Sequence, residues 1–134
     1  MLAARSIDIA IRAPLTQAYG FASQPENFPR WAAGLSSSLH RQGDDWIAET
    51  PEGRAIVLFS PPNDVGILDH HVRLPGKPDI HIPLRMIANG EGTLVVFTLF
   101  GQPDMDDAAF DRDAELVAKD LHALKALLEN LYPA

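Results

Sequence analysis

The segment from residue 106 to residue 131, DDAAFDRDAELVAKDLHALKALLENL, decides the fold of this chain. Its apolar residues alternate steps of four and three, falling at positions 110, 114, 117, 121, 124, 128 and 131. That spacing places them in one seam along a helix of about 39 Å. Asp104, Asp106 and Asp107 stand at its start, where the helix dipole favours negative charge. The sequence therefore predicts a long C-terminal helix that covers an apolar surface.

The part of the chain that precedes this segment supplies that surface as β-structure. Ile7, Ile9 and Ile11 alternate with small or polar residues, which is the pattern of a strand with one buried face. From residue 35 to residue 100, five turn signals separate six further segments, as in an antiparallel meander. The clearest of these segments are 46–50, 54–59, 65–74, 79–88 and 93–100. In the segment 54–59, the two faces are comparably apolar, so its inward face stays undetermined.

Two short helices are expected between the first and second strands. Pro14 presets a first helical turn for residues 15–22. Residues 23–26 (Ser-Gln-Pro-Glu) have the pattern of a capping box, which predicts a second short helix that contains Trp31 and ends at Gly34.

These elements predict an α+β fold in which a curved antiparallel sheet of about seven strands packs around the long C-terminal helix. The 134 residues contain no repeat, linker or low-complexity tract, so we expect a single domain over residues 1–134. A sheet that curves around a helix leaves space between the two.

Composition excludes several functions. The net charge of −7 and a pI near 5 argue against nucleic-acid binding, which depends on Lys and Arg. The longest aliphatic and aromatic run, residues 55–59, is far too short for a membrane span. Absent cysteines and an N-terminus without a signal-peptide pattern fit a cytoplasmic protein. No cofactor is expected.

The order of elements, the opening Ile7-Asp8-Ile9-Ala10-Ile11-Arg12-Ala13-Pro14 and the segment Pro25-Glu26-Asn27-Phe28-Pro29-Arg30-Trp31 resemble the SRPBCC superfamily. That superfamily includes START domains, polyketide cyclases and birch-pollen-allergen-like proteins. The resemblance covers nearly the whole chain and implies a helix-grip fold with an apolar cavity between sheet and helix. Because relatives hold lipids, sterols, polyketides or plant hormones, it implies a small hydrophobic partner without naming one.

One hairpin, residues 65–88, concentrates polar side chains, and strand parity decides which of them face the cavity. If Pro75-Gly76-Lys77 is a three-residue loop, the apolar residues of both strands face the core and His70 points inward. His71 and His81 then lie opposite each other on the outward face. In the other register, His81 and Arg85 point inward instead. A lone inward histidine is either a core residue or a ligand contact, and it is the tentative catalytic candidate.

The remaining candidate residues are apolar. Trp31 is either a cavity lining or a core plug, since its indole both packs and donates a hydrogen bond. The expected ligand-binding residues are Trp31, His70, Ile82, Leu84, Phe97, Leu99, Phe110, Val117 and Leu121. Outward His71, His81 and Asp69 make a poor metal site, so no metal is expected.

Three functions remain open from the sequence. The leading one is binding or transport of a small hydrophobic molecule, and the second is a cyclase- or aromatase-like enzyme with His70 as general acid or base. The third is a protein-interaction module that uses the acidic start of the helix. The helical seam also permits a coiled-coil dimer, although packing on the chain's own sheet is favoured, so we expect a monomer or a weak homodimer.

Overall fold

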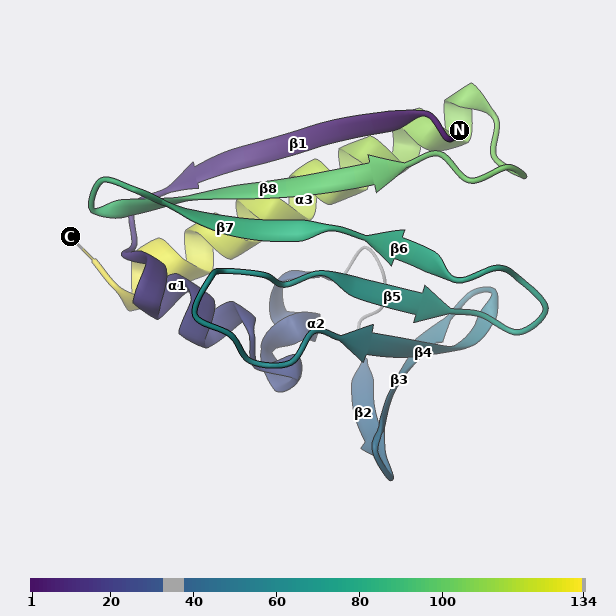
Figure 1. The fold of residues 1–134 in the computed structure, drawn as a ribbon, viewed down its shortest axis with the longest axis horizontal. Helices are drawn as coiled ribbons and strands as arrows, with labels where there is room; N and C mark the ends of the chain where they lie inside the picture. Colours follow the sequence, from purple (N-terminus) through teal and green to yellow (C-terminus); the bar gives the residue numbers. More distant parts are fainter. Residues whose placement is uncertain (33–37, 134) are drawn as a thin grey trace.

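The computed structural model describes residues 1–32 and 38–133; the expected helix end at Gly34 lies outside them. The elements in chain order are β1 (Ala4–Ile11), α1 (Leu15–Ala22), a 3-10 turn η1 (Pro25–Asn27), α2 (Phe28–Trp31), β2 (Leu39–Gln42), β3 (Asp45–Thr50), β4 (Gly53–Phe59), β5 (His70–Arg73), β6 (Ile80–Ile82), β7 (Leu84–Asn89), β8 (Gly92–Phe100) and α3 (Asp107–Leu131). Figure 1 shows α3 lying along one side of β1, β8 and β7, with α1 and α2 on the same side. The predicted α+β helix-grip fold is confirmed.

The strands form two antiparallel sheets, ordered β1-β8-β7 and β2-β3-β4-β5-β6. The two are joined because residues 66–68 run beside the start of β7. There the amide of Leu68 donates to the carbonyl of Leu84, and the amide of Met86 donates to the carbonyl of Gly66, both at 2.8 Å. Together the strands wrap partly around the helices.

The register of the hairpin 65–88 is the one with the three-residue loop. His70 pairs with Ile82, and His71 pairs with His81. The expected inward histidine and the outward histidine pair are therefore confirmed. This register continues to Ile67 opposite Arg85, so a single alignment holds along the whole hairpin.

Pro83 interrupts that hairpin and explains why the described chain has eight strands where about seven were expected. Proline has no amide hydrogen to donate, so the predicted strand 79–88 divides into β6 and β7. Beyond this point β6 pairs only with β5, and the end of β8 pairs only with β1. The two sheets thus separate between β6 and β8.

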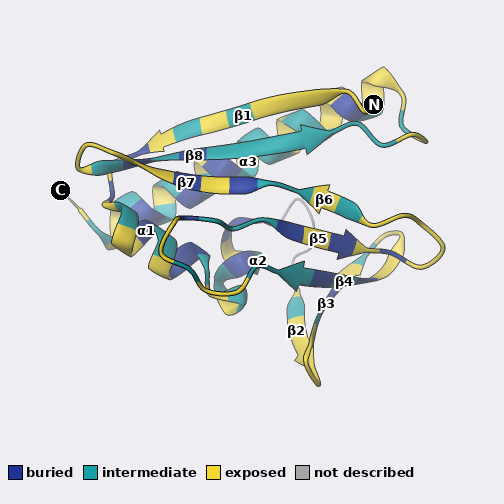
Figure 2. Ribbon diagram, in the orientation of Figure 1, coloured by how far each residue is buried: buried dark blue, intermediate teal, exposed yellow. Residues whose placement is uncertain are grey.

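The core lies between the sheets and α3. Leu121, Leu124 and Leu128 on α3 are almost fully buried, and they share one cluster with Ile11 of β1 and Met86 of β7. Figure 2 shows buried positions alternating along β5 and β7 and following one face of α3. The helical seam therefore packs against the chain's own sheet.

Local details differ from expectation at two places. Residues 23–26 form no capping box: Gln24 precedes η1, and no side chain caps it. Asn27 instead donates from Nδ2 to the carbonyl of Phe21 at 3.0 Å and so holds the connection between α1 and η1. In β4 the buried face carries Ala55 and Val57, which settles the choice that parity left open.

Candidate functional site

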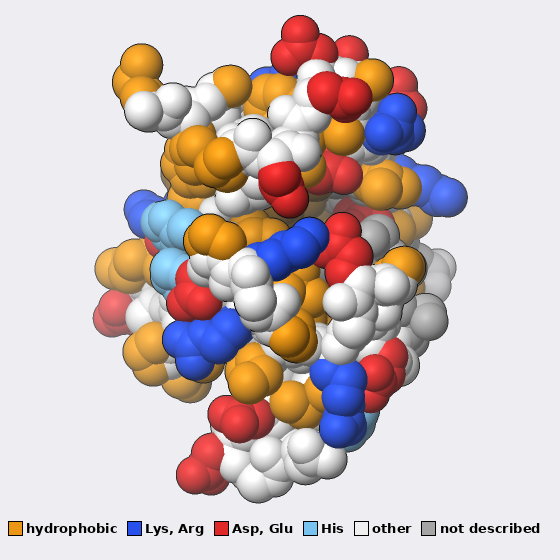
Figure 3. All heavy atoms as spheres, turned by 90° about the vertical axis from the view of Figure 1, so that its right-hand side faces the viewer, with side chains coloured by type: hydrophobic (Ala, Val, Ile, Leu, Met, Phe, Trp, Pro, Cys, Tyr) orange, Lys and Arg blue, Asp and Glu red, His pale blue; other side chains and the backbone are white. Residues whose placement is uncertain are grey.

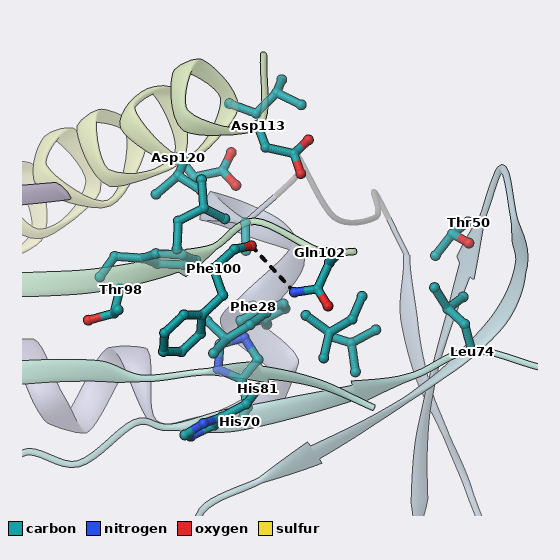
Figure 4. Close-up of a pocket in the computed structure, with 18 of the residues that line it drawn as sticks. Phe28, Thr50, His70, Leu74, His81, Thr98, Phe100, Gln102, Asp113 and Asp120 are labelled. Atoms are coloured by element: carbon teal, nitrogen blue, oxygen red, sulfur yellow. Dashed lines mark hydrogen bonds between the residues drawn. The ribbon is translucent and has the colours of Figure 1, made fainter. Parts of the chain in front are cut away.

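A cavity of about 440 Å³ lies between α3, α2 and the split region of the sheets. Figure 4 shows its lining, with Asp113 and Asp120 extending from α3 toward the strands and His70 on the opposite wall. The cavity opens toward the ends of the loops that follow β3, β5 and β8. In Figure 3, which shows that end of the molecule, apolar side chains are visible between charged ones near the middle of the face.

Seven of the nine expected ligand-binding residues line this cavity: Trp31, His70, Ile82, Phe97, Leu99, Val117 and Leu121. They come from α2, β5, β6, β8 and α3, so elements from the whole chain meet here. Phe97 lies opposite Leu84 in the β7–β8 ladder, on the inward face as expected.

The other two expected residues lie elsewhere. Leu84 is 1% exposed in the core and borders a second, much smaller cavity of about 20 Å³. Phe110, in the first turn of α3, is not among the residues that line the large cavity, and the guanidinium of Arg5 lies 4.4 Å from its ring centroid. Knowing which face of a helix or strand points inward was therefore not enough to identify the lining residues. The position of a residue along its element also decides whether it reaches the cavity.

His70 is 3% exposed and packs against the rings of Phe28 and Phe59. Burial lowers the pKa of its imidazole to about 4, so the ring is neutral at physiological pH. Its Nδ1 lies 3.1 Å from the carbonyl oxygen of Leu68. Since a carbonyl only accepts, Nδ1 carries the hydrogen, and Nε2 is left with a lone pair that accepts.

Trp31 combines the two interpretations drawn from the sequence, because it is 3% exposed and also lines the cavity. Its ring packs edge-on against Phe28 at 5.2 Å between centroids. Its Nε1 is buried and has no hydrogen-bond partner among the described residues. A buried indole N–H without a partner is an unmet donor at the cavity wall.

Sequence reasoning missed the polar lining residues on α3. Asp113 and Asp120, seven residues apart, share a helical face with Val117 and point toward the strands in Figure 4. Burial raises the pKa of the Asp113 carboxyl. Both residues directly precede a position of the apolar seam, but Asp111, Glu115 and Glu129 also flank it, so the sequence pattern does not single out the two lining residues.

The rim of the opening is held by one lysine. Lys77, in the β5–β6 loop, places its Nζ 3.2 Å from Glu52 of the β3–β4 turn and 3.8 Å from Asp104 of the β8–α3 loop. Glu52 lines the cavity, as do Gln102 and Met105 of the last loop. Lys77 thus ties together three loops that are far apart in the sequence.

The polar side chains on the outward face of the hairpin stabilise the fold. Asp69 lies opposite Pro83, where the ladder loses a donor, and its carboxylate accepts from the amide of Leu84 at 2.9 Å and from Arg85 at 2.8 Å through both oxygens. These bonds lower the pKa of the Asp69 carboxyl, with the Arg85 bond contributing most. The rings of His71 and His81 stack in parallel at 4.7 Å.

Two further findings concern metal ions and membrane-spanning helices. No three His, Asp or Glu side chains within residues 1–32 and 38–133 are grouped as a metal ion would require. In the same part of the chain, every helix is too short or too polar to cross a membrane.

No protein-family model matches the sequence, and no curated protein matches it significantly. Solved structures do match its fold. The protein XoxI from Bacillus cereus superposes with a TM-score of 0.75 at 16% identity, covering 96% of this chain and 97% of its own. The Aha1 dimer from Colwellia psychrerythraea gives 0.74 at 15% identity, covering 95% and 96%. Ara h 8.0201 gives 0.65 at 7% identity, covering 97% and 99%.

These likenesses extend over nearly the full length of both partners in each comparison, and they include the sheet and the C-terminal helix. Identities this low carry no information about ligand or activity. The chain has the helix-grip fold that these solved structures share.

Proposed function

We propose that this protein binds a small hydrophobic molecule in the cavity between its sheets and α3. The observation that carries the proposal is the cavity itself, whose volume of about 440 Å³ falls in the range of small-molecule sites. Most of its wall is aliphatic or aromatic, and a few polar groups, among them His70 and Trp31, converge on it. Apolar walls with sparse polar groups favour an apolar ligand that is oriented by a small number of hydrogen bonds.

The enzyme alternative has less support. A general base works best with a pKa near the operating pH, whereas the pKa of His70 is about 4. Its Nε2 accepts hydrogen bonds at neutral pH but is a weak base there. His70 is better suited to orienting a ligand.

The interaction-module alternative loses part of its basis because several acidic residues near the start of α3 already have partners within the chain. Asp106 is the N-cap and accepts from the amide of Ala109 at 2.8 Å. Asp111 pairs with Arg5, and Asp104 lies beside Lys77.

Filling the cavity tests the proposal. Val117→Trp places an indole in the cavity, and we expect it to weaken binding of the neutral dye Nile red by about tenfold or more, because the added volume displaces the ligand. Leu131→Trp adds the same side chain to an exposed position of α3 outside the lining and should change the dye affinity less than about twofold.

Fluorescence titration gives both affinities, and urea unfolding shows that each variant is folded. Native mass spectrometry of freshly purified wild-type protein adds an independent measurement, because a bound molecule appears as a discrete additional mass. Equal dye binding by wild type and Val117→Trp would overturn the cavity as the binding site.

A further inference from the structure

We infer that the cavity prefers apolar molecules whose polar group donates hydrogen bonds, with an ammonium group favoured over a hydroxyl and a carboxylate excluded. This inference rests on the proposed function and assigns a ligand class to the same site. On this inference, fatty acids and other anionic amphiphiles are not ligands of the cavity.

The first argument is the charge of the wall. The described lining residues include the carboxylates of Glu52, Asp113 and Asp120 but no lysine or arginine. A carboxylate ligand would therefore enter a partly desolvated space whose described wall carries three carboxylates, two histidines and no lysine or arginine. Like charges in such surroundings repel strongly, and an unpaired buried charge is costly.

The second argument is the state of the carboxylates. Glu52 already has an ion-pair partner in Lys77 at 3.2 Å. Asp113 makes no hydrogen bond or ion pair with the part of the chain that the structure describes, yet it is partly buried and faces the cavity. An ammonium group beside Asp113 would give that carboxylate a partner at little extra desolvation.

The third argument is independent and concerns the opposite wall. Trp31 Nε1 is buried without a partner among described residues, and His70 offers only an acceptor at Nε2. The rings of Trp31 and His70 both pack edge-on against Phe28, so the side chains that carry the donor and the acceptor lie close together. A hydroxyl can accept from Trp31 and donate to His70, whereas an ammonium group can only donate to His70; this wall therefore favours a hydrogen-bond donor over a carboxylate, and the preference for ammonium over hydroxyl rests on Asp113. A carboxylate could accept from Trp31 but would face the His70 lone pair.

Three ligands with the same ten-carbon chain test the inference: decylammonium, decanol and decanoate. Isothermal titration calorimetry at pH 7, below the concentrations at which they aggregate, gives each dissociation constant. We expect decylammonium to bind about tenfold more tightly than decanol and decanoate to bind at least about tenfold more weakly than decanol, which corresponds to one favourable or one unfavourable charge contact.

Paired variants assign the preference to its residues. Asp113→Asn combined with Asp120→Asn should reduce the ammonium preference, the ratio of the decanol to the decylammonium dissociation constant, to less than about threefold. Asp107→Asn combined with Glu115→Gln removes the same charge from exposed positions of α3 and should leave the preference unchanged. Because the ranking of the three ligands on wild-type protein needs no variant, it holds as a test even if a variant folds poorly.

The possible outcomes distinguish failure of this inference from failure of the proposed function. Decanol binding together with equal or tighter decanoate binding would overturn the inference and leave the proposed function intact. An ammonium preference that both variant pairs reduce equally would reflect net charge and would overturn the assignment to Asp113 and Asp120. Failure of all three ligands to bind, together with failure of Nile red, would overturn the proposed function and the inference with it.

Discussion

Individual residues in this protein show how burial sets their chemistry. His70 and His71 are neighbours in β5, yet strand alternation buries one and exposes the other. Burial penalises the imidazolium form and lowers the pKa of His70, while the exposed His71 stacks on His81. Asp69 shows the opposite effect, because Arg85 stabilises its carboxylate and lowers its pKa. One short segment thus holds a neutral histidine and a stabilised carboxylate side by side.

The pKa of His70 predicts how stability depends on pH. The unfolded histidine titrates near 6.5 and the folded one at about 4, so between these values the unfolded state binds more protons. The stability contributed by neutral His70 is fully present above pH 6.5 and is lost as pH falls toward 4, by up to about 3 kcal/mol. We expect His70→Phe to remove this part of the pH dependence, measured as urea unfolding free energies of wild type minus variant at pH 7, 5.5 and 4.5.

His71→Gln is the control, because it replaces an exposed histidine of the same strand and leaves the buried His70 in place; it should retain the loss of stability between pH 7 and 4.5 that His70→Phe removes. The raised pKa of Asp113 gives the unfolding free energy a pH dependence of opposite sign. Because wild type and variant share this contribution, it cancels in the difference between them. A constant difference between wild type and His70→Phe across this pH range would contradict the prediction.

At the scale of elements, the hairpin 65–88 is the part of the fold that shapes the cavity. Its register points His70, Val72, Ile80 and Ile82 inward, and Pro83 ends the ladder that would have closed β6 onto β8. Residues from both faces near this break, among them Thr98 and Phe100, therefore reach the lining. The cavity exists where the sheet is interrupted.

Gly66 holds the start of this hairpin against β7. Its φ is +75°, and a Cβ at this position would lie 2.0 Å from the carbonyl oxygen of Met86. Gly66→Ala should therefore destabilise the protein by about 3 kcal/mol or more, since neither backbone can move without breaking the hydrogen bond between them. Chemical denaturation measures the change.

Gly76→Ala provides the matched control. Gly76 has a similar φ of +71°, but its Cβ would meet nothing within 4 Å. We expect this variant to show only the cost of the left-handed backbone, about 1 kcal/mol. Equal losses in the two variants would mean that the close approach to Met86 contributes nothing.

At the scale of the whole molecule, α3 acts as both core and cavity wall. Its C-terminal half carries Leu124 and Leu128 into the core, whereas its N-terminal half presents Asp113 and Val117 to the cavity. The helix is fastened at both ends: Asp111 pairs with Arg5 of β1, and Glu129 accepts from the amide of Arg12 at 2.8 Å. Because these contacts hold both ends of α3, the helix keeps its position although the segment between them borders a cavity.

This use of α3 predicts a monomer in solution. A coiled-coil dimer needs the leucine seam at its interface, but Leu121, Leu124 and Leu128 are already covered by the chain's own strands. Light scattering after size exclusion should give a mass near 14.6 kDa, and the melting temperature should not change with protein concentration over about a hundredfold range. A concentration-dependent mass that Leu116→Glu and Leu131→Glu together abolish would instead show a dimer formed through the exposed side of α3.

The sequence by itself predicted most of the elements and their order, because these depend on local patterns, and it left two registers open for the hairpin 65–88, of which the structure has the one with the three-residue loop. Alternation at Ile7, Ile9 and Ile11, the seam of α3 and the parity of the 75–77 loop all act between residues close in sequence. Seven of the nine expected ligand contacts line the cavity for the same reason: the correct face of an element is a local property.

Only the tertiary structure decided where along each element the cavity lies. Leu84 and Phe110 are buried as expected but are not among the residues that line it. Asp113 and Asp120 read as solvated helix residues until α3 is placed against the split between β6 and β8. The polar character of the wall arises from side chains that converge from distant segments, and such convergence is set by packing, which no local pattern contains.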